Sequence, residues 1–593
     1  MNIKTTLTDK EINDLGFKSG LEIHQQLEGR KLFSPAPTTI RDDEPLFTIE
    51  RFLRLSAGES GQVDVAALHE HTKKQRFMYQ GYEETSLVEL DEQPPAAVSP
   101  QAVTSSLQIA KFLDMTVVDQ IRFMRKIVIN GSNTSGFQRT GLIAQNGTLQ
   151  TTQGIVGIES LCLEEDSCKE VEKKEGLVIF NLSRLGIPLL EIATAPDIIS
   201  PTHVQETASQ LGLLLRSLPT VKRGLGTIRQ DVNISIAKGT RVEIKGAQDL
   251  KLLPELARNE ALRQHNLLEI FSELQKRNAC VGEPQELTSL KHSSSKVVQQ
   301  AKGSVYGVKL SGFKGLLGIE IQPERRFGSE LSDYAKQQGV KGLFHSDELP
   351  KYGITQEETD AVFSELGCGE QDGFILIAAP KEQALRALDV ACQRAKDFSL
   401  RKEVRMAKPN GSTSFLRPMP GAGRMYPETD VRPFVPDLDA ITLPELLSDK
   451  IERLAKEYSL DQAIVKKLLR DGYDLETLTT RYQSFKPTFL VDVLYRTHTL
   501  QEQTLLLEKL NEGLLLKDSL EEIIPLLEKG TSVDFNQFKP VSLDDIKKEL
   551  DVLRKEMHDA PLGAVIGQAM RLYKGRVDGK ELSAYIRKLF ETK

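Results

Sequence analysis

Several stretches in the first 250 residues combine carboxylates with imidazole or basic side chains at spacings that suit chemistry. In GLEIHQQL, strand alternation would place Glu22 and His24 on one face and the apolar residues on the other. A carboxylate beside an imidazole suits a divalent metal ion. On a strand edge, however, such a pair is more often a surface pair than a site, so this stretch alone does not decide the function.

Two other acidic stretches differ in what they indicate. LEEDSCKE places Glu164, Glu165 and Asp166 in succession. Three adjacent acids repel one another unless a cation lies nearby, and for this run alone a solvated turn is the simpler interpretation. Glu191 lies in PLLEIATAP, which is apolar enough to form an interior strand. Because an unpaired buried charge is costly, Glu191 indicates a metal ion, a cation or hydrogen-bond donors beside it.

A predicted hairpin carries a mixture of charges. Arg229 and Asp231 alternate onto one face of RQDVNISI, and Glu243 and Lys245 do the same in TRVEIKGAQDL. Such a face would suit Mg²⁺ through its carboxylates and ATP phosphates through its basic groups. The chain has no G-x-x-x-x-G-K-[ST] loop. Any ATP site must therefore be built differently. GSTSFLRPMPGAGRMYPETDVRPF is a further dense polar stretch, and it includes Arg424.

The elements expected to position these residues are short β-branched runs separated by turns. RKIVING, GLVIFNLSRLG, DVNISIAKG and TRVEIKGAQ each predict a strand followed by a turn. PTHVQETASQLGLLLRSL predicts a helix with Ser200 as its N-cap and Pro201 in its first turn. This pattern predicts an α+β fold with a substantial antiparallel sheet. From about residue 440 to the end the pattern is helical.

We expect a multidomain protein, because 593 residues exceed what one hydrophobic core accommodates. The expected parts are an antiparallel-sheet core in two segments, an α+β insert and helical C-terminal domains. Their predicted bounds are 1–274 and 401–440 for the core, 275–400 for the insert, 441–510 for a helical domain and 511–593 for a tail domain.

Composition narrows the class of protein. A hydrophobic content of 39% and a charged content of 27% are typical of soluble globular chains. No apolar run is long enough to cross a membrane and the N-terminus is polar, so we expect a cytoplasmic protein without a membrane anchor. Five scattered cysteines without a C-x-x-C pair argue against a disulfide framework and a structural zinc site.

The charge distribution bears on nucleic-acid binding. A net charge of −7 argues against a general nucleic-acid-binding surface, but a local basic patch remains compatible with it. LYKGRVDGKELSAYIRKLF, near the C-terminus, is such a run, although a solvated helix face is its simpler interpretation. Its basic residues are Lys574, Arg576, Lys580, Arg587 and Lys588.

Taken together, GLEIHQQL, LEEDSCKE, NLSRLGIPLLEIATAPDI, RQDVNIS and VEIKGAQDL, in that order, resemble the family formed by the kinase-like B and E subunits of tRNA-dependent amidotransferases. The insert resembles the extra domain of bacterial aspartyl-tRNA synthetases, and LRPMPGAGRMYPETDV resembles the E-type version of its segment. The archaeal-type E branch is therefore favoured. The C-terminal tail resembles YqeY proteins. RKIVINGSNTSGFQRTG departs from the B-type pattern, so roles of that segment are not transferred.

The resemblance implies a two-step reaction. ATP phosphorylates the γ-carboxylate of glutamate esterified to tRNA(Gln), and ammonia then displaces the phosphate to give Gln-tRNA(Gln), with Mg²⁺ offsetting negative charge. It also implies a hetero-oligomeric ligase whose ammonia comes from an asparaginase-like glutaminase, the D-type partner. Consistent with a separate glutaminase, the sequence shows no obvious nucleophile constellation for amide hydrolysis. Two alternatives stay open: a non-catalytic tRNA-binding scaffold and a metal-dependent hydrolase.

By motif match, the resemblance also implies roles for individual residues. The expected ligands of one Mg²⁺ are His24, Glu191 and one or both of Glu164 and Glu165. The candidates for a second ion bound with ATP are Glu22 and Asp231. The expected catalytic residues are Glu22, Glu165, Glu191 and Asp231. The expected phosphate contacts are Arg229, Lys245 and Arg424. The expected tRNA contacts are the basic residues of the tail named above.

Overall fold

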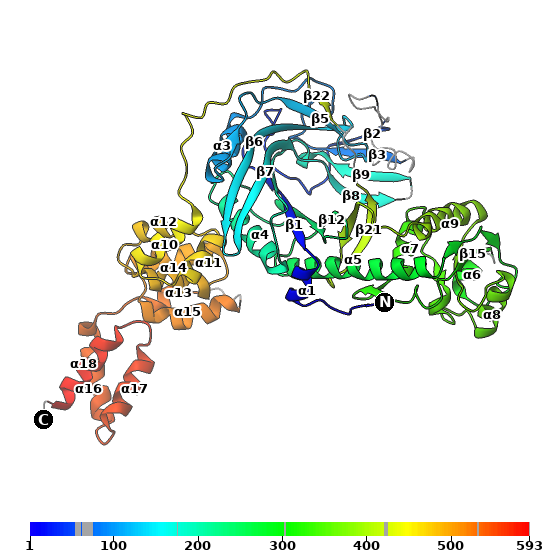
Figure 1. The fold of residues 1–593 in the computed structure, drawn as a ribbon. Coiled ribbons are helices and arrows are strands. Elements are labelled where there is room, and N and C mark those ends of the chain that lie inside the picture. The colour runs from blue at the N-terminus through cyan, green and yellow to red at the C-terminus, as the bar shows by residue number, and fades with distance from the viewer. Residues whose placement is uncertain are drawn as a thin grey trace. The chain divides into compact units, whose positions relative to one another are not determined.

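The chain divides into two compact units, Met1–Leu446 and Leu447–Lys593. The computed structural model describes residues 1–53, 61, 75–174, 176–301, 304–419, 425–529 and 533–591. Several sheets and their covering helices make up the first unit, and the second unit is helical (Figure 1). The expected mixture of helices and sheets with a helical C-terminal region is therefore confirmed. In the described residues, no helix combines the length and the apolar character that a membrane span needs.

The largest sheet of the first unit holds most of the residues singled out in the sequence. Its described strands are β1 (Lys18–Gln26), β4 (Thr116–Val117), β5 (Phe123–Ile127), β6 (Phe137–Thr151), β7 (Gly154–Glu165), β10 (Pro188–Thr194), β11 (Ile228–Ser235), β12 (Val242–Lys245), β20 (Glu403–Ala407), β21 (Thr413–Pro418) and β22 (Met425–Pro427). They are ordered β21-β20-β12-β11-β1-β10-β7-β6-β5-β22, and β4 pairs with β6. Within this sheet, the pairs between described strands are antiparallel except β12–β20, which is parallel. Each of the four β-branched runs noted in the sequence overlaps one strand of the first unit.

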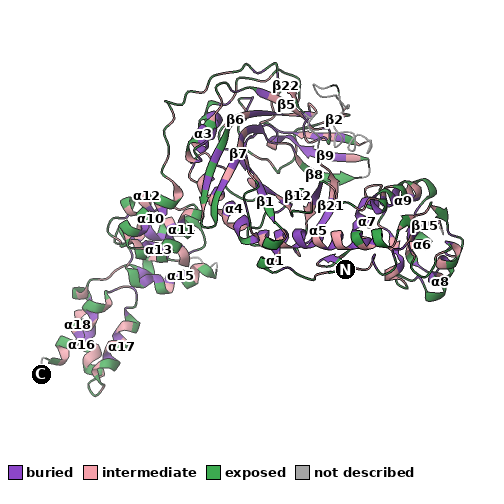
Figure 2. Ribbon diagram, viewed as in Figure 1, coloured by how far each residue is buried: buried purple, intermediate pink, exposed green. Residues whose placement is uncertain are grey.

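The two faces of the large sheet differ in polarity, because successive side chains of a strand point to opposite sides. One face is apolar and lies in a core that it shares mainly with three helices, and Figure 2 shows buried residues recurring along the strands and these helices. These helices are α3 (Pro100–Phe112), α4 (Pro201–Leu215) and the first half of α5 (Leu253–Lys276). The fully buried strand residues of this face include Leu21, Ile23, Leu190, Ile192, Val232 and Ile244. The residues between them turn acidic, amide and basic groups to the other face.

Helix α4 illustrates how local sequence sets an element that supports the sheet. Ser200 precedes it in extended backbone, and its Oγ accepts a hydrogen bond from the backbone N–H of His203 at 3.1 Å. Pro201 occupies the first turn, where its missing N–H costs nothing. The predicted N-cap is therefore confirmed, and the helix buries its apolar stripe against the sheet.

A smaller sheet of the first unit lies beside the large one (Figure 1). Its strands are β2 (Phe47–Arg51), β3 (Arg76–Gly81), β8 (Lys169–Lys174) and β9 (Leu177–Asn181), in the order β2-β3-β9-β8. Strands β7 and β8 are joined through the acidic run, and a short 3-10 helix, Leu182–Arg184, leads from β9 to β10. The segments that follow β7 and β9 therefore converge at the end of the polar face.

Helix α5 joins two hydrophobic cores. Its first half packs with the large sheet, whereas its second half, which contains Leu267 and Phe271, packs with elements of residues 280–396 (Figure 1). The strands of this region are β13 (Cys280–Val281), β14 (Gln285–Glu286), β15 (Val305–Ser311), β16 (Glu320–Gln322), β17 (Arg325–Arg326), β18 (Phe344–His345) and β19 (Gly373–Ala378). The helices are α6 (Lys296–Gln300), α7 (Phe327–Lys336), α8 (Gln356–Glu365) and α9 (Lys381–Lys396).

A buried network of ion pairs lies where the two cores meet. Arg263 of α5 donates to Glu260 at 2.9 Å and to Glu330 of α7 at 2.6 Å. Arg405 of β20 donates to Glu330 at 3.0 Å and to Glu403 at 2.5 Å. Burial opposes ionisation, but the positive charges of Arg405 and Arg263 hold the pKa of Glu330 at about 2. The network therefore fastens α5, α7 and β20 to one another through charged groups removed from water.

Replacing Arg405 by methionine should destabilise the first unit by about 3–5 kcal/mol, because Glu330 and Glu403 would lose a cation while staying buried. Urea unfolding followed by circular dichroism measures the change. Arg386→Met, on the exposed side of α9, is the matched control and should shift stability by no more than about 0.5 kcal/mol. A loss in the Arg405 variant no larger than in this control would contradict the account.

The second unit contains the helices from α10 onward. They are α10 (Leu447–Tyr458), α11 (Gln462–Arg470), α12 (Leu475–Arg481), α13 (Pro487–Arg496), α14 (Leu500–Asn511), α15 (Leu520–Glu528), α16 (Leu543–Glu556), α17 (Leu562–Leu572) and α18 (Gly579–Glu591). One hydrophobic cluster runs from Tyr482 to Phe538 and thus crosses residue 510, where the sequence suggested a seam. The next cluster runs from Ile546 to Ile586. A cut at residue 510 would therefore divide a packed core.

Candidate active site

The polar face of the large sheet gathers candidate residues from strands far apart in the sequence. Strand β1 lies between β10 and β11. In this register His24 lies opposite Glu191 of β10 and opposite Arg229 of β11, and Glu22 lies opposite Asp231. The sheet register thus places five of the predicted residues in two adjacent rows on one face.

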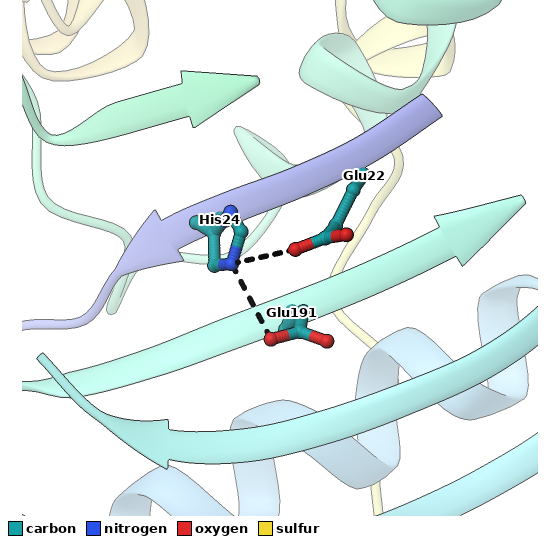
Figure 3. Close-up of side chains that lie close together, drawn as sticks. All are labelled: Glu22, His24 and Glu191. Carbon is teal, nitrogen blue, oxygen red and sulfur yellow. Dashed lines mark ion pairs between the residues drawn. The ribbon is translucent and has the colours of Figure 1, made fainter. Parts of the chain in front are cut away.

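Glu22, His24 and Glu191 form the tightest group. The Nε2 atom of His24 lies 3.3 Å from a carboxylate oxygen of Glu22 and 3.3 Å from one of Glu191, and Figure 3 shows both carboxylates turned toward the imidazole. One ligand atom from each residue lies within 4.8 Å of the other two, as a shared metal ion would require. The Glu191 side chain is 17% exposed, so a ligand can reach it although most of the side chain is buried.

Glu164 and Lys126 extend this group. Glu164 of β7 is buried, contacts the ammonium group of Lys126 on β5, and accepts a hydrogen bond from Gln138 at 2.9 Å. The Lys126 ammonium also lies 3.4 Å from Glu191. Glu164 is therefore a buried carboxylate of the site, and the interpretation of its acidic run as a solvated turn does not hold.

The electrostatics of this group reflect crowded negative charge. Burial and then the charge of Glu191 raise the pKa of Glu22 to about 7. Burial, together with the same neighbouring charge, also raises the pKa of Glu164. Burial also raises the pKa of Glu191, but Lys126 and His24 outweigh this effect and hold that pKa well below the usual range. Burial lowers the pKa of His24, yet its hydrogen bond with Glu191 raises it overall. Added positive charge would relieve this repulsion.

A second charged group lies on the β11–β12 hairpin. The Lys245 ammonium lies 2.5 Å from Asp231 and 2.6 Å from Glu243, so one cation bridges two carboxylates. Burial lowers the pKa of Lys245, but the negative charges of Asp231 and Glu243 raise it overall. Glu22 stands between the two groups, since it faces Asp231 across the strands and also contacts His24. The predicted common polar face of the hairpin is thus confirmed.

The structure separates Glu165 from Glu164. The two residues are adjacent on β7, so their side chains point to opposite sides of the sheet. A Glu165 carboxylate oxygen accepts the backbone N–H of Arg139 at 3.2 Å and lies 3.3 Å from its guanidinium group, which also donates to the buried Glu428 at 2.7 Å. Glu165 therefore lies in a separate ion-pair network and not among the residues around His24. Arg424 lies outside the described residues.

The basic residues of the tail lie on and beside α18. Lys580, Arg587 and Lys588 are exposed on this helix. Lys574 forms an ion pair with Glu522 at 3.1 Å, and Arg576 is half-buried. The structure therefore leaves three of the five predicted basic residues together on the surface of one helix.

Several site residues were not assigned a role from the sequence. Lys126, Gln138 and Cys162 line the polar face, and Gln26 continues the alternation that begins at Glu22 and His24. The period-two pattern of GLEIHQQL contained the signal for Gln26. The carboxylates that Lys126 contacts, Glu164 and Glu191, lie 38 and 65 residues further along the chain, so no local pattern could have placed it at the site.

Comparison with known proteins bears directly on this arrangement. The family described as GatB/GatE catalytic domain matches residues 17–442, which include the whole polar face. The chain belongs to this family. The resemblance drawn from the motifs is thus confirmed, and the family's matched region contains His24, Glu191, Asp231 and Lys245 together with the segments that carry them.

Relatives similar along their whole length indicate the branch of the family. The chain is 42% identical to the E subunit of glutamyl-tRNA(Gln) amidotransferase from Methanococcus maripaludis, over 99% of this chain and 100% of the relative. It is 44% identical to the protein of that name from Methanocaldococcus jannaschii, over 98% and 99%. For the Haloarcula marismortui protein of that name the identity is 40%, over 98% and 99%. The preference for the E branch over the B branch is therefore confirmed.

Proposed function

We propose that the chain is the ATP-using, tRNA-binding subunit of a cytoplasmic, hetero-oligomeric amidotransferase that converts Glu-tRNA(Gln) into Gln-tRNA(Gln). Membership of the family and the names of its full-length relatives support the substrate. The observation that carries the proposal is the polar face around His24, where carboxylates and basic groups meet on three adjacent strands. Such a face suits the handling of charged phosphates and a carboxylate.

The residues around His24 fit a divalent cation. Glu22, Glu164 and Glu191 bring three carboxylates together, and Lys126 supplies one compensating positive charge. We propose that Glu22, His24 and Glu191 would hold Mg²⁺, with Glu164 beside them, and that Glu165 has no part in the set. When bound, the ion would offset the charge of ATP phosphates and of the approaching substrate carboxylate.

In the proposed reaction, an oxygen of the glutamyl γ-carboxylate attacks the terminal phosphorus of ATP, and ADP leaves. The nitrogen of ammonia then attacks the acyl carbon, phosphate leaves with the electron pair of the C–O bond, and the nitrogen loses a proton. ATP is needed because a carboxylate oxygen is a poor leaving group until it carries a phosphoryl group. Arg229 and Lys245 would bind and orient the phosphates, and Arg424 stays a proposed contact. Asp231 would hold Lys245 in place.

Ammonia must be delivered to this chain. Burial raises the pKa of Cys168 and of Cys392 to about 12 and that of Cys368 to about 11, so these thiols are poor nucleophiles. Burial also raises the pKa of Cys162. We therefore propose a stable partner with asparaginase-like chemistry, the D-type glutaminase of the amidotransferase, which would release ammonia from glutamine.

The pure chain should form Gln-tRNA(Gln) from Glu-tRNA(Gln) and Mg-ATP with ammonium chloride, and should form none above background with glutamine. Added partner should restore the use of glutamine. Aminoacyl-tRNA analysis and ADP release measure both steps. Glutamine-dependent product from the pure chain would refute the division of labour. Binding of Glu-tRNA(Gln) without ATP turnover would favour a scaffold, and phosphate release without any need for ammonia would favour a hydrolase.

A further inference from the structure

A buried carboxylate lies at the end of the polar face, beside the candidate active site. Asp166 is 1% exposed. Its Oδ2 atom accepts a hydrogen bond from Nε2 of Gln26 at 2.5 Å, and its Oδ1 atom accepts the backbone N–H of Ser167 at 2.8 Å. Because Gln26 is itself buried, its hydrogen bond holds the Asp166 carboxylate in one orientation inside the protein.

Two arginines share this one carboxylate. Nη2 of Arg229 donates to Oδ1 of Asp166 at 2.7 Å, and Nε of Arg184 lies 3.7 Å from Oδ2. Arg184 is held further by its donation to the backbone carbonyls of Ser167 at 2.7 Å and Cys168 at 2.6 Å. Both guanidinium groups are therefore oriented by the fold, yet the Arg184 side chain is 21% exposed and that of Arg229 is 32% exposed.

The charges of this group do not balance. Arg184 and Arg229 bring two positive charges to the single negative charge of Asp166, which leaves one positive charge in excess. Burial lowers the pKa of Arg184, Asp166 opposes this effect, and the charge of Arg229 lowers it further. Holding two like charges close together costs free energy unless an anion offsets them. This excess lies at the end of a face that is otherwise rich in acids.

We propose that Arg184 and Arg229 form a phosphate-binding site, and that Asp166 and Gln26 are its positioning residues. Two guanidinium forks present more donors than one carboxylate can pair, whereas a phosphate group offers three oxygens to them. Arg229 lies directly opposite His24 across β1 and β11. A phosphate on the arginine pair would therefore lie one strand away from the residues proposed to hold the metal ion. That this phosphate belongs to ATP rests on the proposed function.

Inorganic tripolyphosphate is the probe for this site, because it supplies phosphate groups without a nucleoside. Its affinity for the full chain is measured by titration calorimetry in the presence of Mg²⁺. Arg184→Met and Arg229→Met should each weaken binding about 10- to 100-fold, as expected for lost charge-assisted hydrogen bonds. Arg216→Met is the matched control, since Arg216 is exposed at the end of α4, which packs against the opposite face of the sheet. It should bind like the parent chain.

A conservative change tests the positioning role. Asp166→Asn keeps the shape of the side chain but removes its charge. A site governed only by net charge would bind tripolyphosphate more tightly, because the excess positive charge increases. A site that depends on the placement of Arg184 and Arg229 should bind it less tightly, and this is the expected result. Arg184→Lys, which keeps the charge but loses the fork, should also bind less tightly.

The outcomes separate this site from the proposed function. No tripolyphosphate binding by the parent chain, or unchanged binding in both methionine variants, would overturn the phosphate site. Unchanged binding with a raised KM for Glu-tRNA(Gln) would assign the arginines to the substrate carboxylate instead. Tighter binding by Asp166→Asn would overturn the positioning role. Binding that the arginine variants weaken, in a parent chain that makes no Gln-tRNA(Gln), would support the site and contradict only the proposed function.

Discussion

Replacing Glu191 by glutamine should lower the rate of Gln-tRNA(Gln) formation with ammonium at least about 100-fold and leave the fold intact. Glutamine keeps the size of the side chain but removes the negative charge that faces His24 at 3.3 Å and Lys126 at 3.4 Å. Because Lys126 and His24 favour the charged form of Glu191, the variant should lose some stability yet remain folded under assay conditions. Single-turnover product formation and thermal unfolding measure the two effects.

A matched change of the same type controls for the loss of any glutamate from the sheet. Glu159 is exposed on β7, and Glu159→Gln should keep the parental rate. His24→Ala should raise the Mg²⁺ concentration needed for half-maximal activity at least about tenfold, as expected for a lost ligand. If His24 only stabilised the core, its loss would lower the melting temperature and leave the Mg²⁺ requirement unchanged. A near-parental rate for Glu191→Gln would rule out its role as a metal ligand.

Reversing the charge of Lys580, Arg587 and Lys588 to glutamate should weaken tRNA binding roughly 10- to 100-fold at low salt and lower the slope of log affinity against log salt by about three. These residues are exposed on α18, whereas Leu582 and Ile586 of the same helix are buried. The helix should therefore keep its packing while its surface charge changes. At saturating Glu-tRNA(Gln) the reaction rate should match that of the parent chain.

Other exposed lysines of the second unit provide the control for charge reversal. Lys456, Lys466 and Lys486 are exposed on or beside other helices of the second unit, and their reversal to glutamate should change affinity much less. Deletion of residues 541–593 provides a second variant, because it removes the cluster around α16–α18 and keeps the cluster from Tyr482 to Phe538 whole. Equal affinity of parent and reversed chains across a salt titration would exclude tRNA contacts by α18.

The sequence could predict features that depend on neighbours in the chain. Alternation placed Glu22 and His24 on one face of β1, and the same pattern predicted the charged face of the β11–β12 hairpin. The Ser200 N-cap and the start of α4 followed from local hydrogen-bond chemistry. The apolar residues around Glu191 predicted an interior strand, and β10 does lie inside the large sheet.

The acidic run shows where local reasoning stopped. Alternation alone would send Glu164 and Glu165 to opposite faces, but only if the strand continued through both residues. The sequence favoured a turn there, because three adjacent acids are unfavourable on a strand without partners. The partners, Lys126 and Arg139, lie 38 and 26 residues before them in the chain. Only the paired strands supplied the cations that make burial of this run possible.

What the sequence determined by itself was the polarity of the faces of β1, β11 and β12 and the family to which the motifs point. What only the tertiary structure decided was which strands are neighbours and in which register they pair. That choice puts Glu191 opposite His24, although they lie 167 positions apart in the chain, and puts Arg184 and Arg229 on the same carboxylate. The alternation of side chains along a strand and the capping of a helix depend on short-range sterics and hydrogen bonds. Strand order and register depend on how the whole apolar face packs against α3, α4 and α5, which no local pattern contains.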